Sequence, residues 1–253
     1  MKRPMTRAED AHWEIDMSVH VFKSVGTVVL TVTMLSACGG GGGDPPETPN
    51  PPVLTSFALK AGYQARIVSG ASEDFIVSGS CSGTARIATA PAIASTFEGV
   101  VGVSALQTST LNFTTCSPAS NSATGLTFYN ANYAPIGSSV VGSEYAKFES
   151  PPLDWPAAVK VGQSGTVATL ITYADSRFAV TTGKRIISYE IKADTATTAV
   201  ANIITRSYDR VALLATETMS YRITENGVLT PVLLDVQFST TSTLHLIYTP
   251  TPK

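Results

Sequence analysis

The chain has 253 residues, a formal net charge of −2, 43% hydrophobic residues and only 14% charged residues. No basic patch stands out, which argues against nucleic acid as a partner, and no acidic block predicts a disordered tail. Ser, Thr, Ala and Gly take the place of the missing charges. This composition favours β-structure over exposed helices, which normally carry many Lys and Glu residues.

The first 37 residues have the organisation of a signal peptide. Residues 1–16 are polar and mixed in charge, whereas Met17 begins a more ordinary leader, so Met1 and Met17 are both candidate translation starts. An apolar run follows from Val25 to Met34. It is shorter than the ~20 residues of a transmembrane helix and fits a signal-peptide core of about 7–15 residues.

The run ends in Leu35-Ser36-Ala37-Cys38, which resembles the lipobox of bacterial lipoproteins. The resemblance implies cleavage before Cys38, diacylation of its sulfur and acylation, with palmitate for example, of the new N-terminus. Gly39 in place of Asp favours the outer membrane by the sorting rule of enteric lipoproteins. We therefore predict a cell-envelope protein anchored through Cys38, facing either the periplasm or the outside. The alternative is an ordinary signal peptide with a cysteine near its cut site.

Residues 38–55 are predicted to be a tether. Gly39 to Gly43 form a flexible spacer, and the proline-rich stretch from Asp44 to Pro52 favours semi-rigid, extended geometry.

Residues 56–150 are predicted to form a β-sandwich-like domain. Phe57, Leu59 and Ala61 alternate with other residues as in a strand, residues 88–96 suggest a loop, and further short runs are separated by turn signals. Cys81 and Cys116 are the pair of cysteines that remains beside Cys38, and an oxidising compartment favours a disulfide between them. The alternative is two buried free thiols. No Trp lies between them, so an immunoglobulin core is not supported.

The segment from Ser150 to Pro156 contains three prolines and marks an internal boundary. Residues 157–250 then alternate more regularly, with Asn226-Gly227 as a hairpin signal, and predict an antiparallel meander with one apolar and one polar face. A meander of this kind must roll into a barrel or be covered. We predict an all-β fold, in which a sandwich-like first half precedes a meander or half-barrel. Phrases such as Val161 to Thr166 are also similar to uncharacterised proteobacterial lipoproteins, a resemblance that implies no activity.

Few residues suggest catalysis or metal binding. His245 is the single histidine after Cys38, and Gly79 to Gly83 has only the outline of a nucleophile elbow. No Cys/His cluster has zinc spacing, no calcium loop is present, and Gly39 to Gly43 lacks the lysine of a phosphate loop. We expect no catalytic residue, metal or cofactor. Five tyrosines are candidates either for a pocket or for packing on a sheet: Tyr173, Tyr189, Tyr208, Tyr221 and Tyr248.

Two functions follow from these patterns. The first is a non-enzymatic interaction or structural module that is tied to the membrane by lipid on Cys38. The alternative is a carrier or sensor of an apolar ligand, held in the curled meander. The sequence leaves the protein or ligand partner and the oligomeric state unknown.

Overall fold

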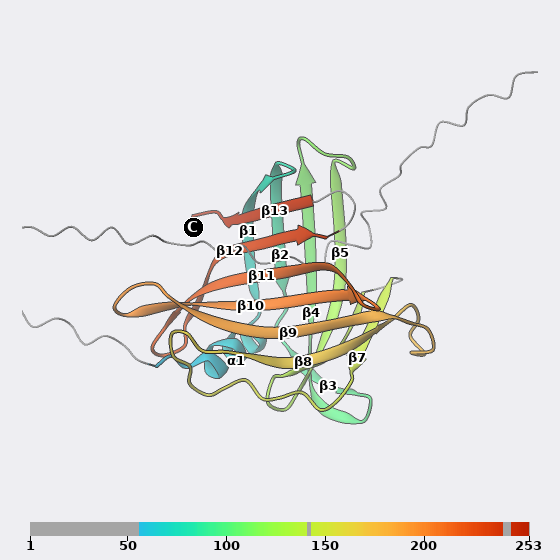
Figure 1. The fold of residues 1–253 in the computed structure, drawn as a ribbon, viewed down its shortest axis with the longest axis horizontal. Coiled ribbons are helices and arrows are strands. Elements are labelled where there is room, and N and C mark those ends of the chain that lie inside the picture. Colours follow the sequence, from blue (N-terminus) through green and yellow to red (C-terminus); the bar gives the residue numbers. More distant parts are fainter. Residues whose placement is uncertain (1–55, 141–142, 240–243, 253) are drawn as a thin grey trace, which may run out of the picture.

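A computed structural model describes residues 56–140, 143–239 and 244–252, which form one helix and thirteen strands (Figure 1). Cys38 and the predicted leader and tether therefore lie outside the described residues. The elements in the first half of the chain are α1 (Leu59–Ser69), β1 (Ala71–Gly79), β2 (Gly83–Thr89), β3 (Ile93–Phe97), β4 (Val100–Phe113), β5 (Ser120–Asn130), β6 (Pro135–Val140) and β7 (Glu144–Phe148). Those in the second half are β8 (Ser164–Tyr173), β9 (Thr181–Ala193), β10 (Thr198–Asp209), β11 (Ala212–Thr224), β12 (Leu229–Phe238) and β13 (Leu244–Pro250).

Twelve of these strands close into one antiparallel barrel. Strands β4 to β13 follow one another in sequence order, β13 pairs with β1, and β1 pairs with β2. The β2–β4 pairing, which runs from Gly83 opposite Phe113 to Thr89 opposite Gln107, completes the ring. The all-β prediction is confirmed. The sandwich and the half-barrel are wrong in detail, because strands from the first half of the chain close the meander instead of folding into a sheet pair of their own.

The alternation seen in the sequence gives the barrel two different faces. On β10, for example, Ala199, Ala201 and Ile203 are buried in the apolar core, whereas the residues between them are the partly buried Val200 and the polar Asn202. Figure 1 shows that β1, β2, β4 and β5 run steeply across the direction of β8 to β11. Inward side chains of these strands form apolar clusters inside the barrel.

The predicted boundary from Ser150 to Pro156 lies in the segment that connects β7 to β8. In the structure this segment is the connection at one end of the barrel, and both halves of the chain contribute strands to the same sheet. We call this end, which also holds α1, the helix end. The opposite end, with the β1–β2 and β4–β5 connections, is called the disulfide end.

Residues 59–69 form a helix, so the strand predicted from Phe57, Leu59 and Ala61 is wrong. Apolar residues recur at a four-residue spacing at Leu59, Tyr63 and Ile67, which places them on one helical face. Tertiary packing decides between the two patterns, because Leu59 and Ile67 are buried. A Cβ on Gly62 would lie 1.9 Å from the carbonyl oxygen of Gly227, so glycine allows α1 to approach the β11–β12 turn.

Part of the predicted loop at residues 88–96 is also strand. Strand β2 extends to Thr89 and β3 begins at Ile93, with a break at Pro91. Both strands pair with β4, β2 with its C-terminal half and β3 with its N-terminal half. Ala and Pro in this stretch therefore mark a short break in a strand, not an extended loop.

Two apolar clusters fill opposite parts of the interior. The larger cluster lies at the helix end, where Trp155, Phe57 and Leu59 pack against β9, β10 and β11. The second lies towards the disulfide end, between β1, β2 and β4 on one side and β12 and β13 on the other, and includes Phe75 and Tyr248. The space between the clusters is lined by polar as well as apolar side chains.

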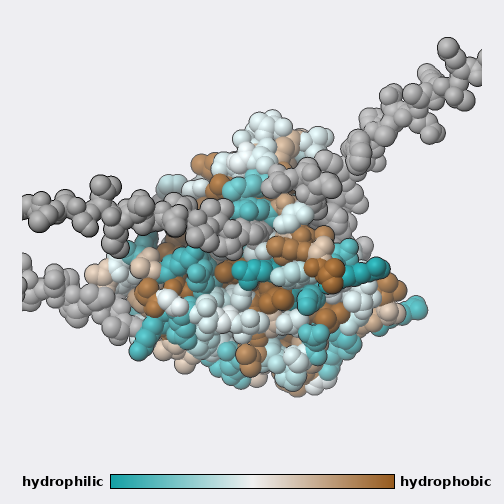
Figure 2. All heavy atoms as spheres, viewed as in Figure 1, coloured by the Kyte–Doolittle hydropathy of each residue, from teal (hydrophilic) through white to brown (hydrophobic). Residues whose placement is uncertain are grey.

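The outer wall carries charged pairs and many Ser and Thr residues. Asp74 lies 3.2 Å from Arg86, and Asp194 lies 2.7 Å from Arg222. The face in Figure 2 intersperses hydrophilic with hydrophobic residues. In the part of the chain that the structure describes, no helix has the length and apolarity needed to span a membrane.

Candidate functional site

A cavity of about 250 Å³ lies inside the barrel, beside α1 and between the two apolar clusters. Helix α1 contributes Tyr63 and Arg66 to its wall, and inward residues of most strands supply the rest. Its volume exceeds the ~150 Å³ that encloses benzene in an engineered protein cavity and is below the range of most drug-sized sites. The cavity can therefore hold one small organic molecule.

At the helix side of the cavity, Arg66 is held by two strands. Its Nη2 donates to Glu73 on β1 at 2.7 Å, and its guanidinium carbon lies 4.8 Å from the centre of the Tyr221 ring. Carboxylate and ring together satisfy this cation, so it can remain charged inside the barrel. Burial raises the pKa of Tyr63 well above its usual value and that of Tyr129 to about 12, so both phenols stay neutral.

On the opposite side of the cavity, Arg185 forms a buried ion pair. Its Nη2 donates to the Glu144 carboxylate, and its Nη1 donates to Ser138 Oγ at 3.2 Å. The exposed fractions of the two charged side chains are only 12% and 6%. Burial lowers the pKa of Arg185 to about 10, while nearby Glu217 acts in the opposite direction. Arg185 Nε has no hydrogen-bond partner among the described residues.

Glu217 on β11 faces the same cavity and is placed there by the alternation of its strand. It is opposite Thr205 on β10 and Val236 on β12, neither of which is charged. Burial raises the pKa of Glu217 to about 7, and the charge of Arg185 only partly opposes this shift. The carboxyl group therefore changes between its neutral and charged forms near neutral pH.

A second hollow, of about 510 Å³, lies at the disulfide end of the barrel. Its wall includes Glu144 and Thr172 together with Lys184 and Tyr208, whose ammonium group and ring centre are 5.7 Å apart. Glu144 lines this outer hollow, whereas its partner Arg185 lines the inner cavity. The buried ion pair thus stands between the two spaces.

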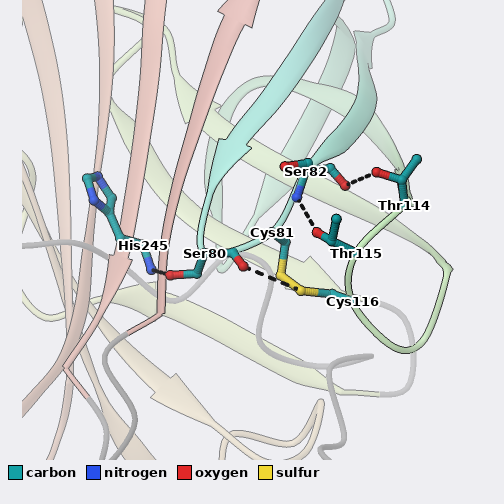
Figure 3. The surroundings of a disulfide bond; sticks show 7 residues. All are labelled: Ser80, Cys81, Ser82, Thr114, Thr115, Cys116 and His245. Carbon is teal, nitrogen blue, oxygen red and sulfur yellow. Dashed lines mark hydrogen bonds between the residues drawn. A yellow bond between two sulfur atoms is a disulfide. The ribbon is translucent and has the colours of Figure 1, made fainter.

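Cys81 and Cys116 form the predicted disulfide, with Cα atoms 5.6 Å apart (Figure 3). The bond joins the β1–β2 connection to the β4–β5 connection. Hydrogen bonds reinforce this junction, because Ser82 N–H donates to Thr115 Oγ1 at 2.8 Å and Thr114 Oγ1 donates to the Ser82 carbonyl at 3.1 Å. The disulfide therefore secures the two strands beside the closing β2–β4 pair. Cys38 lies outside the described residues.

His245 lies on the outer wall and does not line the cavity. Its Nε2 is 3.3 Å from Asp235 Oδ1, and its backbone N–H donates to Ser80 Oγ at 3.0 Å (Figure 3). No cluster of three or more metal-ligating side chains occurs among the described residues.

The five candidate tyrosines divide between the two roles that the sequence left open. Tyr221 and Tyr248 line the cavity. Tyr189 packs in the larger apolar cluster, while Tyr173 contacts Phe178 with ring centres 5.2 Å apart and Tyr208 borders the outer hollow.

Sequence reasoning missed the charged groups of the cavity. In β11, Glu217 lies on the same face of the strand as Met219 and Tyr221. In β9, Arg185 lies on the same face as Ile187 and Tyr189. A charged residue among the apolar positions of an alternating strand is the signal that could have indicated them, because buried charges need partners.

Comparison of the chain with protein-family models, curated proteins and solved structures found no match.

Proposed function

We propose that this protein is a non-enzymatic, lipid-anchored binding protein of the bacterial cell envelope, which holds a small ligand inside its barrel. The observation that carries this proposal is the internal cavity of about 250 Å³. It favours the carrier or sensor over a purely structural module, since packed protein interiors leave few voids larger than a water molecule. The wall is amphipathic, so the ligand is expected to carry a polar group as well as an apolar body.

A cavity-filling substitution tests ligand binding. Ser109 on β4 is 3% exposed and lines the cavity, and its hydroxyl has no partner among the described residues. We expect Ser109→Met to weaken binding of benzyl alcohol, a benzene-sized probe, at least about tenfold, because the new side chain occupies the site. Binding is measured by ligand-observed NMR, together with mass spectrometry of molecules extracted from the purified protein.

Thr108→Met is the matched control, because Thr108 is the exposed neighbour on the same strand. It should bind the probe as the wild type does. If the wild type neither binds such probes nor releases a small molecule on extraction, the barrel is not a binding protein.

The proposed anchor rests on Leu35-Ser36-Ala37-Cys38. Two or more acyl chains attached to one protein give stable membrane attachment. We expect cells that express the protein to incorporate labelled palmitate into it, and Cys38→Ala to abolish the label and release the protein from the membrane fraction. Cys81→Ala with Cys116→Ala should keep the label. Label that persists in the Cys38 variant would contradict the anchor.

A further inference from the structure

The charged groups around the cavity do not balance. Arg66, Arg185, Glu73 and Glu217 line the cavity, and Glu144, which lines the outer hollow, is bound to Arg185. With every group ionised, these five groups together carry one negative charge in excess. Buried charge in a low-dielectric interior is costly unless it is paired.

The excess is localised on Glu217. Glu73 is bound to Arg66, and Glu144 is bound to Arg185. Among the described residues, no carboxylate–guanidinium contact of this kind includes Glu217, and its charged neighbour, Arg185, already donates to Glu144 and Ser138. An anionic ligand would meet two guanidinium groups that each already bind a carboxylate, whereas a cation would meet a carboxyl group that binds no guanidinium in the described part of the chain.

The surroundings of Glu217 suit the body of an organic cation. The rings of Tyr221 and Tyr248 line the same cavity, and both phenols interact electrostatically with Glu217. Ring faces attract cations, and this attraction strengthens when water is excluded. Met219 and Ile203 supply apolar surface in the same wall.

We propose that the ligand is a small organic monocation, an amine or a related ammonium compound, whose charge pairs with Glu217 among the tyrosine rings of the cavity. This inference rests on the proposed function and names its ligand class. In the bound state the charge of the ligand balances the excess charge of Arg66, Arg185, Glu73, Glu144 and Glu217.

Three probes of nearly equal size test the sign of the charge: benzylammonium, benzyl alcohol and benzoate. We expect benzylammonium to bind the purified chain at least about tenfold more tightly than either of the others at pH 8, as measured by calorimetry or NMR. Glu217→Gln should remove this preference, because the amide keeps the shape and loses the charge. Glu190→Gln removes a carboxylate from the outer wall of β9 and should have no effect.

The pH dependence gives a second readout that needs no variant. The groups that interact with Glu217 are Arg185, Tyr221 and Tyr248, and they keep their charge states between pH 6 and pH 8. Across that interval Glu217 ionises, so the affinity for benzylammonium should rise about tenfold while that for benzyl alcohol stays constant.

The outcomes separate this inference from the proposed function. Binding of benzyl alcohol or benzoate with no preference for benzylammonium would contradict the proposal that the ligand is a cation, and would still support the proposal that the barrel binds a ligand. A preference that survives Glu217→Gln also overturns the assignment of the cation to this residue. If none of the probes binds, both proposals fail.

Discussion

Replacing Trp155 with alanine should lower the free energy of unfolding by about 3–5 kcal/mol, the range for large aromatic side chains removed from a core. Trp155 is 1% exposed, and its ring centre lies 4.3 Å from that of Tyr63 on α1. Its indole N–H donates to the Tyr133 carbonyl at 3.1 Å. The substitution therefore removes packing and leaves a buried carbonyl without its donor.

Helix α1 is the element that we expect to respond most strongly. It has only 11 residues, no side-chain hydrogen bond at its N-cap, and a glycine at position 62. A helix this short is marginal without tertiary contacts. Loss of the Trp155 contact should therefore speed hydrogen exchange at α1 amides more than at the amides of β9 and β10.

Urea unfolding followed by circular dichroism measures the stability change, and mass spectrometry measures the exchange. Leu153→Ala is the control, because Leu153 is 67% exposed two residues away and should change stability by no more than about 0.5 kcal/mol. Trp155→Phe should cost an intermediate amount, since it keeps part of the ring and loses the donor. A loss below about 1 kcal/mol for Trp155→Ala, or unchanged exchange in α1, would contradict this account.

Local patterns in the sequence were sufficient for the meander and its turns. The apolar residues that alternate in β9, β10 and β11 include the buried Ile191, Ala201 and Ile223, whereas a register shift interrupts the alternation in β12. The hairpin at Asn226-Gly227 joins β11 to β12. Only Gly227 of the pair has a positive φ, of 81°, so the turn is not the type I′ form that the two residues favour. Such features are predictable because they depend on neighbours in the chain.

Closure of the barrel could not be predicted in the same way. It depends on the pairing of β1 with β13 and of β2 with β4. The alternation of residues within a strand does not specify which other strand it pairs with. The sequence did indicate that the meander needed a cover for its apolar face. The first half of the chain supplies the strands that close the barrel, and α1 contributes buried side chains to its interior. Both features depend on the whole fold.

The candidate site was less predictable than the fold, because its groups are far apart in sequence. Arg66 and Glu73 meet across the turn from α1 to β1, whereas Arg185 meets Glu144 from a strand two positions away in the barrel. Each of these residues is ordinary on a solvent-facing surface, and only the strand parity of Arg185 and Glu217 separates them from surface charges. The disulfide was predictable because counting the cysteines left a single pair.

The buried ion pair provides the second large effect. Glu144→Ala should cost about 3–5 kcal/mol, because it leaves Arg185 buried without its closest carboxylate. Glu144→Ala combined with Arg185→Met should be less destabilising than the sum of the two single changes, since replacing both charges removes the unpaired one. A double-mutant cycle by urea unfolding at pH 8 measures this coupling.

The charge on Glu217 makes the cost of Arg185→Met depend on pH. Burial raises the pKa of Glu217 to about 7, above the value of an unfolded chain, and the nearby Arg185 opposes this shift. Without Arg185 the folded-state pKa is expected to rise further. The folded protein then keeps a proton that the unfolded chain releases, so stability falls as pH rises from about 4.5 towards the folded-state pKa.

Arg185→Met should therefore be closer to the wild type at pH 5 than at pH 8. The matched control is Lys192→Met on the outer wall of the same strand, where the pair with Glu190 is about half exposed. Removing an exposed pair of this kind changes stability by no more than about 1 kcal/mol at either pH. Equal losses for Arg185→Met at both pH values, or additive effects in the cycle, would show that Arg185 does not hold the carboxyl groups of the cavity in their charged form. The cavity would then lack the fixed charge arrangement on which recognition of a cation depends.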